Sequence, residues 1–156
     1  MQREQNKNLF ESIWDEPPRY QRPVDLDRLA DGIKMLPPSY WKERMFFFAA
    51  SDRRLKAATK AFPARINRHR GTHPLFVMRV IPEVGSRLCP CSTKCWYVKR
   101  FISKGCRLEI TGKVTDRDSY LVEDLSFILP QDPAFWKPLR FAGRVPEACI
   151  EKVPRP

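Results

Sequence analysis

Fifteen prolines are spread along this chain of 156 residues, against only six glycines. A proline fixes its own φ angle and has no backbone N–H to donate, so it ends helices and is kept out of the centre of a sheet. The chain is therefore predicted to form short elements joined by stiff turns rather than a bundle of long helices. Its length fits one domain, and a hydrophobic fraction of 42% can supply one core.

The net charge of +11 lies in the middle of the chain. Residues 41–112 carry sixteen basic and four acidic side chains, whereas residues 1–40 and 113–156 are close to neutral. Such a basic region attracts polyanions, although a solvated, solubilising surface and an anionic membrane are alternatives. Arginine dominates the densest part, and a guanidinium binds two phosphate oxygens at once. We therefore expect nucleic acid as the partner.

The chain shows no sign of a membrane segment. Its longest apolar run, residues 45–50, has six residues, well below the roughly 20 that a membrane helix needs. Residues 1–7 are polar and lack the apolar segment of a secretion signal. These observations predict a cytoplasmic protein with no membrane partner.

Residues 1–40 read as a helical arm attached to a domain over residues 41–156. Apolar residues at helical spacing precede Pro17-Pro18, and a second such stripe runs from about residue 25 to Leu36. Two short helices bury little by themselves, so the arm must pack on the domain or on a partner. Tyr40, Trp41 and Trp136 are predicted to pack between the arm and the domain.

The first half of the domain carries strand signals. Residues 45–50 form an apolar run that fits a strand or part of a helix. We favour a strand followed by a long basic first loop over residues 51–73, with a helical turn around residues 55–60. Residues 75–81 are almost continuously apolar, and residues 82–86 form a turn before the next strand begins at Arg87.

The second half predicts further strands and a closing helix. Residues 106–111 alternate between apolar and polar, as in a half-buried strand. The apolar parity changes near Glu123–Asp124, which indicates a bulge or bend there. Pro146 can occupy the first turn of a C-terminal helix. Together these signals predict an α+β fold built on a small, strongly bent sheet or barrel.

Five cysteines in an apparently cytosolic chain argue against a disulfide framework. Four of them, Cys89, Cys91, Cys95 and Cys106, are weak candidates for metal ligands, because their spacing lacks the usual Cys-x2-Cys pairs, in which two residues separate the cysteines. If residues 87–91 form a strand, the same positions fit small apolar residues of a core. We expect no cofactor.

Three segments resemble the PemK/MazF-like family of toxin–antitoxin endoribonucleases. They are residues 73–78 (HPLFVM), residues 88–93 (LCPCST), and residues 118–128 followed by residues 139–146 (LRFAGRVP). The resemblance covers roughly residues 73–153. It implies a small SH3-like barrel that forms a homodimer and binds RNA over a basic groove.

The resemblance also implies a chemistry. Members of this family cut single-stranded RNA without a metal, using the ribose 2′-hydroxyl as the nucleophile. Carried over by position, their catalytic residues become His73 and Ser92, with Thr93 adjacent. The family has an arginine where His73 stands here, and Arg70 is the candidate to supply that positive charge. A histidine can exchange protons near neutral pH but lacks a permanent charge.

Nucleic-acid contacts are predicted along the basic loop and in the segment 96–101, where aromatic rings alternate with cations. Such rings can stack bases, or they can simply belong to a core. The candidate contacts are Arg65, Arg68, Lys94, Trp96, Lys99 and Arg100. An acidic antitoxin peptide is a second possible occupant of the basic loop. The main functional hypothesis is thus an endoribonuclease, with a non-catalytic nucleic-acid-binding module or a metal-stabilised interaction protein as alternatives.

Overall fold

The computed structural model describes residues 36–64, 71–95 and 97–154. The two predicted helices of the arm lie almost wholly outside these residues, as do Arg65, Arg68, Arg70 and Trp96. Leu36, at the end of the second predicted helix, is described and is buried at 4% exposure. Its carbonyl oxygen accepts a hydrogen bond of 2.8 Å from the indole N–H of Trp41. The packed domain therefore begins no later than Leu36.

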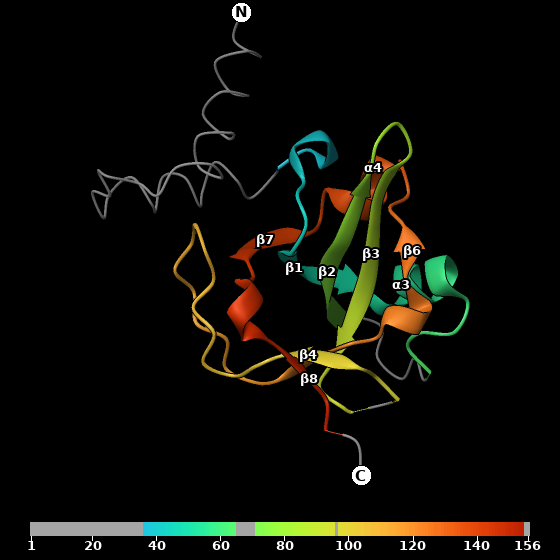
Figure 1. The fold of residues 1–156 in the computed structure, drawn as a ribbon. Coiled ribbons are helices and arrows are strands. Elements are labelled where there is room, and N and C mark those ends of the chain that lie inside the picture. The colour runs from blue at the N-terminus through green and yellow to red at the C-terminus, as the bar shows by residue number, and fades with distance from the viewer. Residues whose placement is uncertain (1–35, 65–70, 96, 155–156) are drawn as a thin grey trace, which may run out of the picture.

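The described chain forms a small α+β half-barrel of mostly antiparallel strands (Figure 1). The strands follow the order β7-β1-β2-β3-β5-β4-β8, and β6 pairs with β3 beside this path. The strands are β1 Met45–Ser51, β2 Thr72–Ile81, β3 Gly85–Ser92, β4 Arg100–Ile102, β5 Ser119–Leu121, β6 Phe127–Ile128, β7 Arg140–Arg144 and β8 Ile150–Lys152. The helices are α3 Asp52–Thr59 and α4 Pro133–Trp136, with 3-10 turns η1 Pro38–Tyr40, η2 Glu123–Leu125 and η3 Glu147–Cys149. Among the described residues, no helix is long and apolar enough to cross a membrane.

Apolar side chains from alternate strand positions form two clusters. Along β1, Phe47 joins one cluster while Phe46 joins the other, and Leu75 and Phe76 divide in the same way along β2. This alternation follows from the period of two in a strand, which sends neighbouring side chains to opposite faces. Trp41 lies in the first cluster, and Tyr40 and Trp136 pack against it. Whether they also contact residues 1–35 of the arm falls outside the described residues.

Strand β1 contains a bulge that matters for the site. Phe47 pairs with Leu75 and Ala50 pairs with His73, so two β1 residues stand opposite the single residue Pro74. Proline has no N–H to give to the ladder, which makes this the favourable place for an extra residue. Ala49, one of the two bulged residues, has a positive φ of 73°.

Helix α3 begins directly after this strand. The Ser51 hydroxyl caps it by accepting a hydrogen bond of 3.2 Å from the N–H of Arg54. The strand at residues 45–50 is thus confirmed, and the helical turn predicted around residues 55–60 is a full helix of eight residues that begins at Asp52.

The predicted bend near Glu123–Asp124 is confirmed, because η2 separates β5 from β6 there. The predicted strand at residues 106–111 is wrong. Its alternation is real, since Cys106 and Leu108 are buried and their neighbours are exposed. Ile110, however, turns the chain with a φ of 76°. The segment instead belongs to an irregular hairpin, residues 103–118, that pairs only through isolated bridges.

The predicted C-terminal helix is also wrong. Pro146 leads into the single 3-10 turn η3, and the chain then extends into β8. Ile150 pairs with Ile102 of β4, and the Cys149 carbonyl accepts a hydrogen bond of 3.0 Å from the Ser103 N–H. The apolar residues Val145, Cys149 and Ile150 pack in or against the second apolar cluster from a 3-10 turn and a strand, because β4 offers an open edge that β8 completes.

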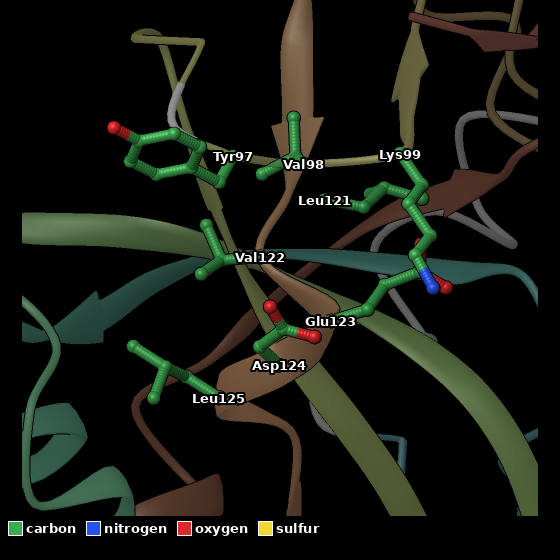
Figure 2. Close-up of a pocket in the computed structure, with 8 residues that line it drawn as sticks. All are labelled: Tyr97, Val98, Lys99, Leu121, Val122, Glu123, Asp124 and Leu125. Carbon is green, nitrogen blue, oxygen red and sulfur yellow. The ribbon is translucent and has the colours of Figure 1, made fainter.

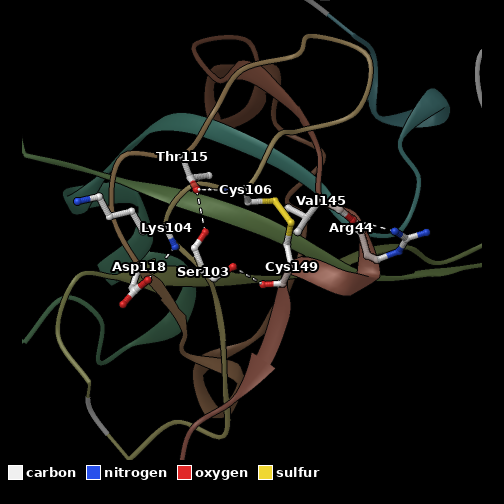
Figure 3. Close-up of a disulfide and its surroundings, with 8 residues drawn as sticks. All are labelled: Arg44, Ser103, Lys104, Cys106, Thr115, Asp118, Val145 and Cys149. Atoms are coloured by element: carbon white, nitrogen blue, oxygen red, sulfur yellow. Dashed lines mark hydrogen bonds between the residues drawn. A yellow bond between two sulfur atoms is a disulfide. The ribbon is translucent and has the colours of Figure 1, made fainter.

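A disulfide joins Cys106 to Cys149, contrary to the expectation from cysteine usage (Figure 3). The two residues are 43 positions apart in the chain, so the pairing arises only when the hairpin folds against η3. Cys106 in this form is not a thiolate that could bind a metal. Cys89 and Cys91 are buried in the second apolar cluster, while Cys95 is exposed.

Candidate active site

A cleft of about 1030 Å³ opens where the ends of β1, β2 and β3 meet the hairpin 103–118. It brings together three residues predicted from the sequence, namely His73, Ser92 and Thr93. The strand register explains their proximity. Leu75 pairs with Pro90, and the same register continued by two residues places His73 opposite Ser92.

His73 is held by a carboxylate that the sequence analysis did not single out. Its Nδ1 atom forms a short hydrogen bond with Oδ1 of Asp52. Asp52 is 8% exposed and is the first residue of α3, so the helix fixes its position. The ring of Phe62 packs edge-on against the imidazole, with ring centroids 4.8 Å apart. A carboxylate on Nδ1 favours the tautomer in which Nε2 is free to accept a proton.

The hydroxyl of Ser92 is already used in a turn. It accepts a hydrogen bond of 3.1 Å from the Lys94 N–H, and the residue is only 7% exposed. This is the local turn-forming role that serine often has at the end of a strand. Thr93, the next residue, is exposed and lines the cleft.

Three cations of the cleft come from elements outside the segments singled out as sites. Lys113 and Arg117 come from the hairpin, and Arg140 comes from β7. Arg117 pairs with its neighbour Asp116 at 3.1 Å, and this hydrogen bond lowers the pKa of the Asp116 carboxyl. Nothing in the sequence marks these cations as neighbours of His73, because the hairpin and β7 reach the cleft only through long-range packing.

The hairpin is fastened at both ends. Near β7, the Thr111 hydroxyl donates a hydrogen bond of 2.6 Å to the Ala142 carbonyl. Near η3, the disulfide joins Cys106 to Cys149, and the Ser103 hydroxyl donates to the Cys149 carbonyl at 3.3 Å (Figure 3). These contacts hold the Lys113–Arg117 segment against the cleft.

The other predicted contacts lie elsewhere. Arg100 forms a bidentate pair with Glu123, with distances of 2.6 and 3.2 Å, and this pairing raises the pKa of its guanidinium. Lys99 lines a separate pocket of about 290 Å³ together with Tyr97 and Asp124 (Figure 2). Lys94 is exposed and contributes its backbone N–H to the turn at Ser92. The remaining four predicted contact and charge residues, Arg65, Arg68, Arg70 and Trp96, fall outside the described residues.

The buried cysteines behave as core residues. Burial, followed by a hydrogen bond to Cys91, raises the pKa of the Cys89 thiol well above its ordinary value. A thiol that resists deprotonation is a poor metal ligand. Among the described residues, no group of three or more histidine, cysteine, aspartate or glutamate side chains is arranged to hold a metal ion.

Comparison with known proteins adds no assignment. Neither a protein-family model, nor a curated protein, nor a solved structure matches this chain.

Proposed function

We propose that this protein is an endoribonuclease of the toxin–antitoxin type, built on an SH3-like barrel of the PemK/MazF kind, that cleaves single-stranded RNA without a metal. One observation carries the proposal. A histidine held by a buried carboxylate shares a cleft with strand-end hydroxyls and cations. The sequence resemblance points to the same positions, with the family's arginine replaced by His73.

His73 would act as the general base. Its Nε2 atom takes the proton of the ribose 2′-hydroxyl, and the 2′-oxygen attacks the adjacent phosphorus. The bond from phosphorus to the 5′-oxygen breaks, which leaves a 2′,3′-cyclic phosphate and a free 5′-hydroxyl. Asp52 is a positioning residue, because it orients the imidazole and stabilises its protonated form, as the aspartate of a hydrolase triad does.

The remaining groups stabilise the negative charge of the phosphorane and protonate the leaving 5′-oxygen. Arg140 and Arg117 place positive charge where the phosphorane develops its negative charge. Thr93 can donate a hydrogen bond to a non-bridging oxygen. Lys113 carries the only ammonium among the described residues that line the cleft, so it is the group assigned to protonate the leaving 5′-oxygen.

The test is cleavage of a 5′-labelled single-stranded RNA by the full chain in the presence of EDTA. We expect fragments that end in a cyclic phosphate, and loss of cleavage in His73→Ala. The chain has only one other histidine, so His69→Ala is the matched control and should cleave like the wild type. Intact RNA after incubation with folded wild-type protein would contradict the proposal.

A non-catalytic nucleic-acid-binding module is the second candidate. The hydrogen bond that Ser92 Oγ accepts from the Lys94 N–H favours it, because this contact gives the serine a structural task. This second candidate predicts salt-sensitive RNA binding without cleavage. The two candidates therefore separate in the same experiment, when binding and cleavage are measured on one RNA.

The resemblance also supports two proposals about the setting of the protein. We propose that it is a homodimer and that an acidic antitoxin peptide is its protein partner. A cytoplasmic location stays a prediction from the polar first residues, and the Cys106–Cys149 disulfide argues against it, because disulfides are rare in the cytosol. Sedimentation tests the dimer directly. For the partner, this protein is produced in bacteria together with a candidate acidic peptide. The true antitoxin should relieve growth arrest, whereas an unrelated acidic peptide should not.

A further inference from the structure

Alternation along β1 places an aromatic ring in the cleft beside an arginine. Phe46 and Phe48 both line the cleft, and the buried Phe46 ring holds the half-buried Phe48 ring edge-on, with centroids 5.3 Å apart. Phe48 pairs directly with Arg140 on the neighbouring strand β7. A fixed ring and a guanidinium thus stand side by side on two adjacent strands, at one wall of the cleft.

Arg140 is also electrostatically available. The described part of the cleft contains two acids, and both are engaged, Asp52 by His73 and Asp116 by Arg117. Among the described residues, no carboxylate pairs with Arg140, whose side chain is exposed. An unpaired guanidinium in a cleft is suited to an incoming anion, and it grips a phosphate with two hydrogen bonds.

We propose that Phe48 and Arg140 form a subsite for one unstacked nucleotide, with the base on the Phe48 ring and its phosphate on the Arg140 guanidinium. This inference rests on the proposed function and deepens it. Stacking on an aromatic ring needs a base with a free face, which a single strand offers and a duplex does not. The subsite therefore selects single strands and places the neighbouring ribose near His73, on the strand that pairs with β1.

The test measures binding of a fluorescent 2′-O-methyl oligoribonucleotide, which lacks the nucleophile and stays intact, and of the duplex of the same sequence. Phe48→Leu should weaken single-strand binding about 5- to 150-fold without changing its salt dependence. It should leave duplex binding unchanged. Arg140→Gln should reduce the slope of log K against log salt concentration by about 0.7, the value for one phosphate contact on a single strand.

Arg79→Gln is the matched control, since Arg79 is an exposed arginine of β2 that does not line the cleft. Equal effects of Arg79→Gln and Arg140→Gln would overturn the proposal, as would wild-type single-strand affinity in Phe48→Leu. If Phe48→Leu does not fold, Phe48→Trp keeps a ring at the position. Its added fluorescence should then be quenched by the single strand but not by the duplex, and absence of quenching would overturn the subsite.

Cleavage is measured separately, so that the two proposals fail in different ways. Binding that depends on Phe48 and Arg140 without any cleavage of ordinary RNA would reject the nuclease and keep the subsite. If the wild type cleaves RNA and neither substitution changes single-strand binding, the subsite is rejected and the nuclease is kept. A wild type that binds no single strand rejects both.

Discussion

The two walls of the cleft are built by different means. One wall, the strand wall, consists of the ends of β1, β2 and β3, which pair along most of their length, together with the start of α3. It carries the His73–Asp52 pair. The other wall is the hairpin 103–118, which pairs through isolated bridges and is fastened by a disulfide and a few hydrogen bonds. The groups assigned to proton transfer from the 2′-hydroxyl need fixed geometry and lie on the strand wall. The hairpin wall carries Lys113, which is assigned to protonate the leaving 5′-oxygen, and Arg117, which acts through its charge.

The largest effect is expected on the strand wall, in Asp52→Asn. The amide keeps the shape of the side chain but favours the wrong tautomer of His73, so the cleavage rate should fall about 10³- to 10⁴-fold. RNA binding should not weaken, because a negative charge is removed from the cleft. Single-turnover cleavage with separately measured affinity checks this. Asp124→Asn, at an exposed carboxylate outside the cleft, is the control and should cleave normally.

The second effect concerns the hairpin wall and its disulfide. A cross-link between residues 43 positions apart stabilises a folded chain by about 2–4 kcal/mol. Cys149→Ser should lower the free energy of unfolding by that amount. It should also weaken RNA binding and slow the chemical step, because the hairpin carries both Arg117 and the assigned proton donor Lys113. Urea unfolding, binding titrations and single-turnover cleavage measure the three quantities. Cys95→Ser is the control, because Cys95 is exposed and unbonded. Equal loss in both variants would show that the hairpin does not depend on the bond.

Gly143 tests how closely the hairpin approaches β7. A Cβ atom at this position would lie 2.7 Å from Leu108 Cβ and 3.0 Å from the Glu109 carbonyl oxygen. Gly143→Ala should therefore cost about 1–3 kcal/mol of stability through overpacking and should displace the hairpin wall. Gly105→Ala is a matched control, since Gly105 also has a positive φ but nothing within 4 Å of the added atom. A similar loss in both variants would assign the effect to backbone strain alone.

Local signals in the sequence were sufficient for the strand wall. Apolar runs, the turn at residues 82–86 and the proline positions predict β1, β2 and β3, and the resemblance adds His73, Ser92 and Thr93. Asp52 was missed as a site residue, because its contact with His73 joins residues 21 positions apart, which local periodicity does not show. The Cys106–Cys149 pairing and the approach of Arg140 depend on contacts between distant segments, which a single sequence does not reveal.

The C-terminal segment shows why periodicity alone misleads. Val145, Cys149 and Ile150 fit one face of a helix, and all three do pack in or against the second apolar cluster. They reach it from a 3-10 turn and a strand, because β4 has a free edge that β8 completes. Over so few residues, a helix and a 3-10 turn followed by a strand can bury the same side chains. Hydrogen-bond partners on another strand, which the sequence does not show, decide between them.

The smallest effect is expected outside both walls, at the Arg100–Glu123 pair. The Arg100 side chain is 38% exposed and the Glu123 side chain 22% exposed, so solvent screens most of their attraction and the pair stabilises the fold by at most about 1 kcal/mol. Arg100→Gln should therefore change the free energy of unfolding by no more than this and should leave the cleavage rate unaltered, because Arg100 does not line the cleft. Urea unfolding and the single-turnover assay measure both quantities. A loss of cleavage comparable to that of Asp52→Asn would place the catalytic surface near Arg100. It would then contradict the assignment of catalytic roles to the two walls of the cleft.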